Sequence, residues 1–319
     1  MKNNPLKVLA VALVALMSAG VYAQTNENKP AKEDADGYSL KAARAGQVSI
    51  GLDFNPVAAA KATSASALAE VGKFMFKDLI GPQEKQPREM FFLAQNPMAS
   101  IAVKYKISEI VAFKASIGFS GGVSNYREYV QDDAAIAKNP LSDAKVADLI
   151  SFHYTGGGVS AGVEFTGGKK SLRFIGGLGL KYAWGGGYAK VNYGNEITSA
   201  NQKPSTIAKI DTINTFPGAV QMEYGRPVKQ YGVGISHGVG IYASAGIEWF
   251  FIKNVSLGVT VDITPFMVAF QPQTYVIYEG YNKYSGQVEN YNELVSPGST
   301  YLLYGTDNIG CTLSLNYYF

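Results

Sequence analysis

The feature that most constrains the fold of this chain is a rhythm of eight alternating segments. In each segment apolar residues occupy every second position, the period of a β-strand with one apolar and one polar face. The connections between segments are alternately short and long. The predicted strands are 46–55, 98–106, 110–122, 150–165, 171–187, 231–251, 255–266 and 301–319. The rhythm predicts eight antiparallel strands, with three short turns at one end and four long loops at the other.

The lengths of the connections separate two fold classes. Short turns are predicted at 107–109, 166–170 and 252–254, whereas 56–97, 123–149, 188–230 and 267–300 are long. In an ordinary compact domain, structureless loops of that length would count against the assignment. Outer-membrane barrels combine short periplasmic turns with long extracellular loops. The sequence therefore predicts an all-β fold, an eight-stranded antiparallel transmembrane up-and-down β-barrel.

The two faces of the predicted strands differ in charge, as a barrel in lipid requires. The apolar positions, such as Leu52, Phe174 and Leu315, carry no charged residue. The opposite positions carry nine, which are predicted to form a charge network in the lumen: Asp53, Lys104, Lys106, Lys114, Glu164, Arg173, Lys181, Glu248 and Asp262. A soluble β-sandwich would instead turn its charges outward and bury its aliphatic residues in a shared core.

The role expected for the lumen charges is structural. Eight strands enclose an interior that side chains can fill. A turn about Gly168–Lys169 would place Glu164 opposite Arg173, a favourable cross-strand pair. The alternative is a narrow gated channel in which the charges exchange partners. We also expect a β-bulge at 156–158, where the apolar positions of the fourth strand change parity.

Aromatic residues gather near both ends of the predicted strands. One group lies beside the short turns and the C-terminus and comprises Tyr105, Phe165, Trp249, Phe251, Tyr317 and Phe319. A second group toward the long loops includes Tyr182, Trp184 and Tyr188. Membrane barrels carry such aromatic girdles at their two interfaces.

The N-terminal residues indicate export. Lys2 and Lys7 precede an apolar run, and small residues lead to a predicted cleavage between Ala23 and Gln24. This pattern is typical of a secretory signal peptide. The expected organisation is a signal peptide at 1–23, a polar periplasmic tail at 24–45 and the barrel at 46–319. The mature chain contains no apolar run near 18 residues, so a closed barrel is the available way to span a membrane.

Composition excludes several other classes of protein. The chain has 28 Lys+Arg against 25 Asp+Glu, so it lacks the basic excess of a nucleic-acid-binding protein. The single cysteine, Cys311, excludes an internal disulfide framework and a thiol-based metal site. The glycine-rich stretches lack the Lys-Ser/Thr ending of a phosphate-binding loop. We predict no cofactor and no metal.

The two histidines, His153 and His237, are the candidates for a catalytic base. A serine hydrolase needs a histidine oriented by a carboxylate, and neither "SFHYT" nor "ISHGVG" places an acid nearby. No catalytic residue is therefore predicted. The long loops are the expected place of function. The last is rich in Tyr and Asn, and the first contains a possible short helix with Leu68, Val71 and Phe74 on one side.

The mature chain resembles a known family in the segments "VSIGLDFNP", "GIEWFFIKNVSLGVTVDITPF" and "SLNYYF". It looks like the OmpA-like eight-stranded outer-membrane barrels, particularly the "outer membrane beta-barrel" proteins of Bacteroidota. The resemblance implies location in the outer membrane, contact with its lipid, and assembly by the barrel-assembly machinery, with Phe319 as the C-terminal assembly signal. It also implies an accessory role beside other outer-membrane proteins.

The function expected from the sequence is that of a non-enzymatic barrel with a structural or interaction role, as an accessory subunit of a larger outer-membrane complex. Two alternatives stay open. The first is a small solute channel, whose conductance would change when Glu164 or Arg173 is neutralised. The second is a lipid-modifying enzyme, whose activity would be lost on substitution of His153 and His237.

Overall fold

The structure of the chain is a computed structural model that describes residues 45–56, 99–168, 171–208, 211–212, 224–306 and 309–319. These residues form one short helix and strands joined only by antiparallel pairings. The elements are β1 (Val48–Phe54), β2 (Ala99–Lys106), β3 (Val111–Gln131), α5 (Asp133–Lys138), β4 (Lys145–Gly167), β5 (Leu172–Asn192), β6 (Asp211–Thr212), β7 (Tyr224–Ile252), β8 (Val255–Gln271), β9 (Thr274–Asn282), β10 (Gln287–Ser296), β11 (Ser299–Tyr304) and β12 (Ile309–Tyr318).

Eight of the described strands close into a ring. Neighbours pair in the order β7-β5-β4-β3-β2-β1-β12-β8, and a further β7–β8 pairing joins the two ends. The first and last strands are neighbours, with Leu52 opposite Leu315. Closure removes the unpaired strand edges that a sheet otherwise exposes. The predicted eight-stranded up-and-down barrel is confirmed, and we refer to this ring as the barrel.

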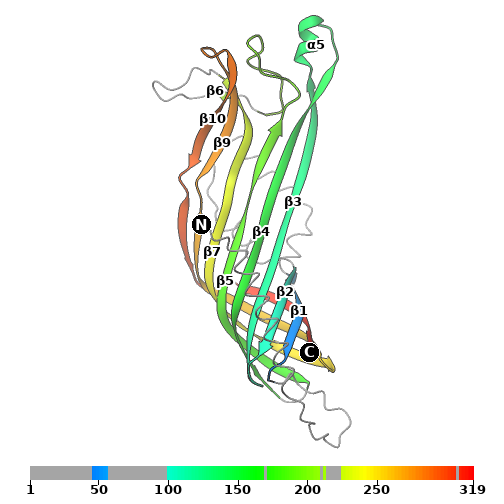
Figure 1. Ribbon diagram of the computed structural model, residues 1–319, viewed down its shortest axis with the longest axis vertical. Coiled ribbons are helices and arrows are strands. Elements are labelled where there is room, and N and C mark those ends of the chain that lie inside the picture. The colour runs from blue at the N-terminus through cyan, green and yellow to red at the C-terminus, as the bar shows by residue number, and fades with distance from the viewer. Residues whose placement is uncertain (1–44, 57–98, 169–170, 209–210, 213–223, 307–308) are drawn as a thin grey trace, which may run out of the picture.

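One end of the barrel, here called the turn end, carries the short connections. The β2–β3, β4–β5 and β7–β8 turns lie there, and so does the C-terminus (Figure 1). The β7–β8 turn is tight because Asn254 adopts a left-handed conformation, with φ of 66°. The backbone N–H of Phe319 donates to the carbonyl of Val48 at 2.9 Å. The last residue of the chain is therefore held against the first strand.

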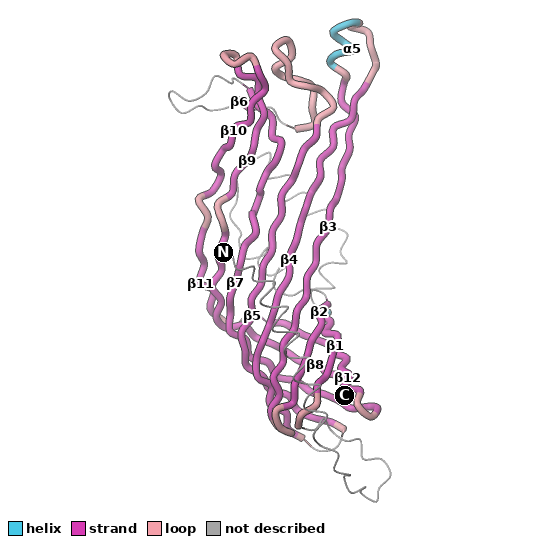
Figure 2. Tube along the Cα trace, in the orientation of Figure 1, coloured by secondary structure: helices cyan, strands magenta, loops and turns pink. Residues whose placement is uncertain are grey.

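The opposite end, here called the loop end, departs from the prediction. Strands β3, β4, β5 and β7 continue far beyond β1 and β2 (Figure 2). Part of three predicted loops is therefore strand, and the loop predicted at 267–300 is largely the β9–β10 hairpin with the start of β11. We call residues 120–131, 145–156, 185–192 and 224–236, together with β9 and β10, the extension. The strands continue because the backbone N–H and C=O groups of neighbouring strands hydrogen-bond to each other well above the barrel.

The predicted eighth strand is divided into two. Strands β11 and β12 lie one after the other along the same partner, β8. The pairing with β8 ends at Tyr304 and resumes at Ile309. Gly305, directly after β11, has φ of 144°, a conformation that favours glycine.

The outer face of the barrel is apolar and exposed, as the alternation predicts. Leu178 is 58% exposed and Phe174 is 66% exposed. Others of this set are Leu52, Ile101, Phe119, Leu180, Ile241, Trp249, Val261 and Leu313. So much contiguous apolar surface is unfavourable in water, and it is the outer surface of a barrel embedded in lipid.

Four of the aromatic residues predicted at the turn end contact one another in two pairs. The rings of Trp249 and Phe251 are 5.7 Å apart and those of Tyr317 and Phe319 are 5.2 Å apart. Toward the loop end Tyr182 contacts Trp184 at 5.8 Å. Trp184 lies over Gly157, where a Cβ atom would come 2.4 Å from its ring. This glycine therefore makes room for the tryptophan across the β4–β5 pair.

The predicted bulge at 156–158 is wrong. β4 pairs with β3 and with β5 without a shift of register through these residues. The parity of the strand is constant, and what changes is the chemistry of its inner face. Ile150 and Phe152 lie inward and form a small core with Ala189 and Val191, on which Tyr193 and Ile207 pack.

Several predictions concern residues outside the described ones. The signal peptide, its cleavage at Ala23 and Gln24, the tail at 24–45 and the possible helix of the first loop all fall there. Within the described part of the chain, no helix has the length and apolar character needed to cross a membrane.

Candidate functional site: the barrel lumen and the loop end

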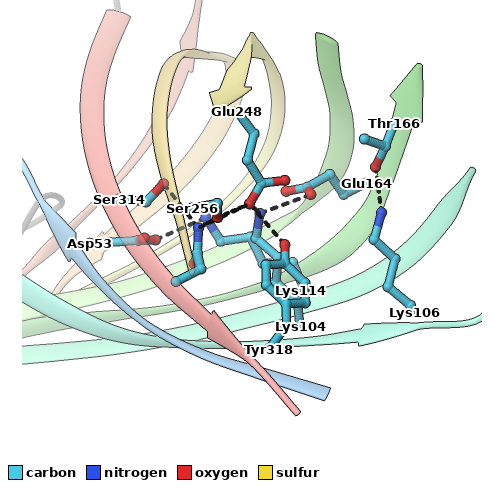
Figure 3. Close-up of polar contacts among 11 residues, drawn as sticks. Asp53, Lys104, Lys106, Lys114, Glu164, Thr166, Glu248, Ser256, Ser314 and Tyr318 are labelled. Carbon is cyan, nitrogen blue, oxygen red and sulfur yellow. Dashed lines mark hydrogen bonds and ion pairs between the residues drawn. The ribbon is translucent and has the colours of Figure 1, made fainter. Parts of the chain in front are cut away.

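The lumen near the turn end is closed by buried ionic groups. Lys104 on β2 lies between Glu164 on β4 and Glu248 on β7 (Figure 3). Its Nζ is 2.9 Å from Oε1 of Glu164 and 3.7 Å from Oε1 of Glu248. Lys104 is 1% exposed and Glu248 is 0% exposed. Burying charges is costly unless they are paired and hydrogen-bonded, and here one cation serves two carboxylates.

Glu248 also joins the last strand to this network. Its Oε1 accepts hydrogen bonds from Ser256 Oγ at 2.6 Å, Tyr318 OH at 2.8 Å and Asn316 Nδ2 at 3.2 Å. Tyr318 and Asn316 are 1% exposed and belong to β12, which forms the seam with β1. The ring of Phe250 packs 5.4 Å from that of Tyr318. We call Lys104, Glu164, Glu248, Asn316 and Tyr318 the plug.

A second layer of charges lies further toward the loop end. Lys114 Nζ is 2.9 Å from Asp53 Oδ2, and Lys181 Nζ is 3.5 Å from Asp262 Oδ2. These four residues line a polar cavity of about 100 Å³, together with Tyr242 and several serine and threonine hydroxyls. The lumen is therefore filled by ion pairs at the turn end and hollow above them.

The two remaining predicted charges also lie on the inward face. Lys106 donates to Thr166 Oγ1 at 2.7 Å. Arg173 lies opposite Glu248 in the β5–β7 ladder, with its guanidinium carbon 5.9 Å from the centre of the Phe250 ring. The predicted pair of Glu164 with Arg173 is wrong, because the register places Glu164 opposite Gly177. The β4–β5 turn is centred further along the chain than predicted, since Gly167 still pairs with Phe174.

At the loop end, the segment 193–208 folds back on the inner face of the extension. Asp148 of β4 is fully buried and accepts from Gly194 N at 2.8 Å, Thr206 Oγ1 at 2.7 Å and Ile207 N at 3.1 Å. One inward carboxylate thus holds both ends of the segment. This explains why a stretch predicted as an open loop is folded.

A second carboxylate ties the same segment to α5. Asp133 accepts from Asn201 Nδ2 and from Ser205 N, each at 2.7 Å. Desolvation by burial raises the pKa of Asp133, but these hydrogen bonds outweigh it and hold the pKa below its usual value. Asn195 completes the contact by donating to the carbonyls of Gln131 and Ser205 at 2.7 and 2.9 Å. We call Asp133, Asn195, Asn201 and Ser205 the loop clasp.

A buried arginine fixes the far side of the extension. Arg226 Nε donates to Glu279 Oε1 at 2.7 Å, and its guanidinium lies 3.9 Å above the ring of Tyr193. The hydroxyl of Tyr193 donates to the carbonyl of Pro227. Burial raises the pKa of Tyr193, so this donor keeps its proton. Strands β7 and β9 and the folded segment are joined at one point.

The two histidines contact tyrosines. The ring of His153 stacks on that of Tyr188 with centroids 4.5 Å apart, and Nδ1 of His237 is 2.7 Å from the hydroxyl of Tyr182. Among the described residues, no group of three or more His, Cys, Asp or Glu side chains is arranged to hold a metal. These contacts give neither ring an orienting acid.

The sequence missed the neutral partners of the network. Asn316 and Tyr318 alternate with the apolar residues of the last strand, and this inward parity was the available signal. No sequence pattern indicated the loop clasp or the role of Arg226. Asp133 contacts residues more than 60 positions away in the chain, and Arg226 contacts Glu279, which is 53 positions away. Phe319 lies at the turn end beside β1, which leaves its role in assembly a prediction.

A closed antiparallel ring, an apolar outer face and an ionised lumen together define the class of transmembrane β-barrels. The class follows from strand pairing and exposure alone.

No protein-family model matches the chain, and no curated protein matches it. Among solved structures, the chain is similar to Ail, the attachment invasion locus protein of Yersinia pestis, with 11% identity, 86% of this chain and 97% of that chain covered, and a TM-score of 0.25. It is also similar to the E. coli outer membrane protein W (9%, 88% and 99%, 0.27) and to a major outer membrane protein from Thermus thermophilus (9%, 86% and 98%, 0.27). Likeness this weak assigns no function, and membership of the OmpA-like family stays a prediction.

Proposed function

We propose that the protein is a non-enzymatic outer-membrane barrel that holds its loop end at the cell surface as a platform for protein contacts, as an accessory subunit of a larger outer-membrane complex. In this orientation the turn end faces the periplasm. The predicted signal peptide and the short turns support that direction.

The observation that carries the proposal is the difference between the two ends of the molecule. The lumen is filled at the turn end by the plug, whose charges are paired and buried. The loop end is folded well beyond the barrel by Asp148, the loop clasp and Arg226. A chain that closes its lumen at one end and builds a folded structure above the other is suited to presenting a surface.

The extension offers such a surface. It is an open sheet whose outermost described strands are β3 and β10. Along β3 the side chains of Tyr126 and Tyr129 are exposed. Tyrosine provides large contact area at low entropic cost, and an unpaired strand edge can accept a partner strand.

The test is affinity capture from gently solubilised outer membranes through a tag in the 24–45 tail. We expect a stoichiometric partner that survives washing and is lost from the Tyr126→Ala/Tyr129→Ala variant. Tyr284→Ala removes a tyrosine at the β9–β10 turn that is 78% exposed, against 74% for Tyr129, and serves as the control away from β3. Recovery of the barrel without a partner from wild-type membranes contradicts the accessory role. Recovery from the soluble fraction contradicts the membrane location itself.

A small solute channel is the second candidate, and the polar cavity above the plug favours it. Conduction would require Lys104 to leave both carboxylates. We expect no discrete conductance for the pure wild-type barrel in planar bilayers, because the ion pairs fill the lumen. Discrete wild-type conductance that changes in Glu164→Gln would replace the accessory role with the channel.

A further inference from the structure

The inward side chains nearest the turn end form one layer across the lumen. Lys106 is the last inward residue of β2, and Arg173 is the first of β5. Thr166 and Phe250 occupy the same layer as the last inward residues of β4 and β7. The layer therefore holds two cations, and within the described residues no inward acid accompanies them at this level.

Lys106 is a buried cation with a neutral partner. It is 1% exposed, and its Nζ donates to Thr166 Oγ1 at 2.7 Å, apart from the ion pairs of the plug (Figure 3). Its backbone is fixed as well, because its N–H donates to the carbonyl of Gln47 at 2.9 Å. A buried ammonium group is costly unless a negative charge compensates it. In the described part of the chain, no carboxylate forms an ion pair with Lys106.

Arg173 also lacks an acidic partner among the described residues. Its guanidinium lies against the ring of Phe250, and its Nε is buried without a hydrogen-bond partner. The side chain as a whole is half-buried, and its terminal nitrogens are the part that reaches solvent. Glu248 lies opposite Arg173 in the β5–β7 ladder, but its Oε1 is taken up by the contacts of the plug. An anion would therefore reach Arg173 from the turn end.

The turn-end half of the lumen carries one excess positive charge. Among the described residues, it holds three cations against two carboxylates, namely Lys104, Lys106 and Arg173 against Glu164 and Glu248. The second layer of charges is balanced, with two lysines paired to two aspartates. Electrostatic attraction is stronger in a low-dielectric lumen than in bulk water. A bound monoanion would balance the excess charge, whereas a dianion would be repelled by the two glutamates.

We propose that the turn end of the lumen binds one carboxylate group, which Arg173 contacts through its terminal nitrogens while Lys106 supplies attracting charge behind it. Arginine offers two parallel N–H donors that match the two oxygens of a carboxylate. In the orientation proposed above, the carboxylate comes from the periplasm, either on a free small acid or on an acidic peptide side chain. The site requires only the closed barrel, and it lies at the opposite end from the surface proposed for protein contacts.

The test is a ¹H–¹⁵N NMR titration of the full mature barrel in detergent micelles, which follows the Nε–H resonance of Arg173 at constant ionic strength. The probes are acetate, the α-amide of N-acetylglutamate, chloride and sulfate. We expect a saturable shift with acetate and little response to chloride or sulfate. A matching shift with the blocked glutamate extends the site to peptide side chains. Arg173→Lys identifies the resonance because it removes the Nε–H group and keeps the charge.

The variants separate the charge behind the site from charge elsewhere. Lys106→Gln keeps the Arg173 resonance and should weaken acetate binding about tenfold, because it removes one charge in a low-dielectric surrounding. Lys145→Gln removes an exposed lysine at the loop end of β4 and is the matched control. It should leave the affinity unchanged, because it lies many Debye lengths from the site. Heat-modifiable migration shows that each variant is folded.

The competing arrangement is an internal pair, since Oε2 of Glu248 is also buried without a partner. Arg226, whose Nε donates to Glu279, gives the resonance position of an arginine that already holds a carboxylate. An Arg173 resonance at that position without added acid would overturn the proposal. The absence of a saturable shift, equal binding of chloride or sulfate, or an unchanged affinity in Lys106→Gln would do the same. Partner capture without acetate binding refutes this site alone, whereas acetate binding without a captured partner refutes the accessory role alone.

Discussion

Strand β4 passes through two surroundings with one uninterrupted register, and its inner face changes character between them. In the barrel the inward residue Glu164 is charged and the outward residue Val163 is apolar. In the extension the inward residues Ile150 and Phe152 form a core. The outward residue between them, Ser151, is polar and pairs with Lys190 on β5. The same alternation is thus inverted where the outer solvent changes from lipid to water. Apolar residues mark the side away from water, and that side differs in the two regions.

The largest effect is expected inside the barrel. Glu248→Ala leaves Lys104, Tyr318 and Asn316 without their shared acceptor. Breaking a buried ionic contact on one side costs about 3–5 kcal/mol. Urea unfolding of the barrel in lipid vesicles measures this loss. Glu293→Ala removes an exposed acid from β10 of the extension, and a change beyond about 0.5 kcal/mol there would contradict the contrast between the regions.

The second largest difference between the barrel and the extension is expected when a charge is placed on the outer face of each. Leu178 lies midway along the apolar outer surface of β5, and Asn192 lies at its end in the extension; both are exposed. Leu178→Arg should cost about 2–4 kcal/mol, the cost of a charge at the bilayer midplane of a barrel. Asn192→Arg should leave unfolding in vesicles within about 0.5 kcal/mol of wild type. Equal losses of unfolding free energy in the two variants would show that both outer faces lie in the same surroundings, either lipid or water.

A smaller effect is expected in the core of the extension. Ile150→Val removes one methylene group from a residue that is 1% exposed, at a cost of about 1 kcal/mol. The loss should appear as faster hydrogen exchange in β4 and β5 of the extension, with exchange in the barrel unchanged. The same substitution at the lipid-facing Ile241 is the control. Faster exchange throughout the barrel would mean that the two regions unfold as one unit.

The smallest effect concerns pH and the loop clasp. The pKa of Asp133 is lowered in the folded state, so its contribution is complete above the ordinary aspartate pKa near 3.9 and is lost as pH falls through the folded value below it. Segment 193–208 should therefore gain proteolytic or exchange accessibility at pH 2–3 relative to pH 7. Asp133→Asn should show greater accessibility already at pH 7 and less change with pH.

The inward and outward faces of the barrel strands could be predicted from the sequence, because the two-residue period of a strand is visible within that strand alone. The inward set from Asp53 to Asp262 and the outward set around Leu178 required only the parity of each strand. The partners of the charges required the ring. Lys104 and Glu164 are on strands that are not adjacent, and they meet because a narrow lumen brings long inward side chains together.

The register of a hairpin also depends on its turn, and this is where the Glu164–Arg173 prediction failed. Several glycines and lysines in succession leave the turn centre undefined, and a shift of the turn changes every cross-strand partner. The loop end is the larger difference, since length and polarity predicted open loops there. Asp148 and Asp133 fold the segment 193–208 through hydrogen bonds to distant backbone groups, for which the sequence has no periodic signal.

The sequence by itself determined that the chain forms a barrel, how many strands close it, and which face of each strand meets lipid, since alternation and connection lengths are local properties. Only the tertiary structure decided which charges pair in the lumen, where the strands end, and that Lys106 donates to Thr166. Those features depend on strand register and on contacts between residues far apart in the chain. The closed ring determines both, and no local pattern in the sequence encodes them.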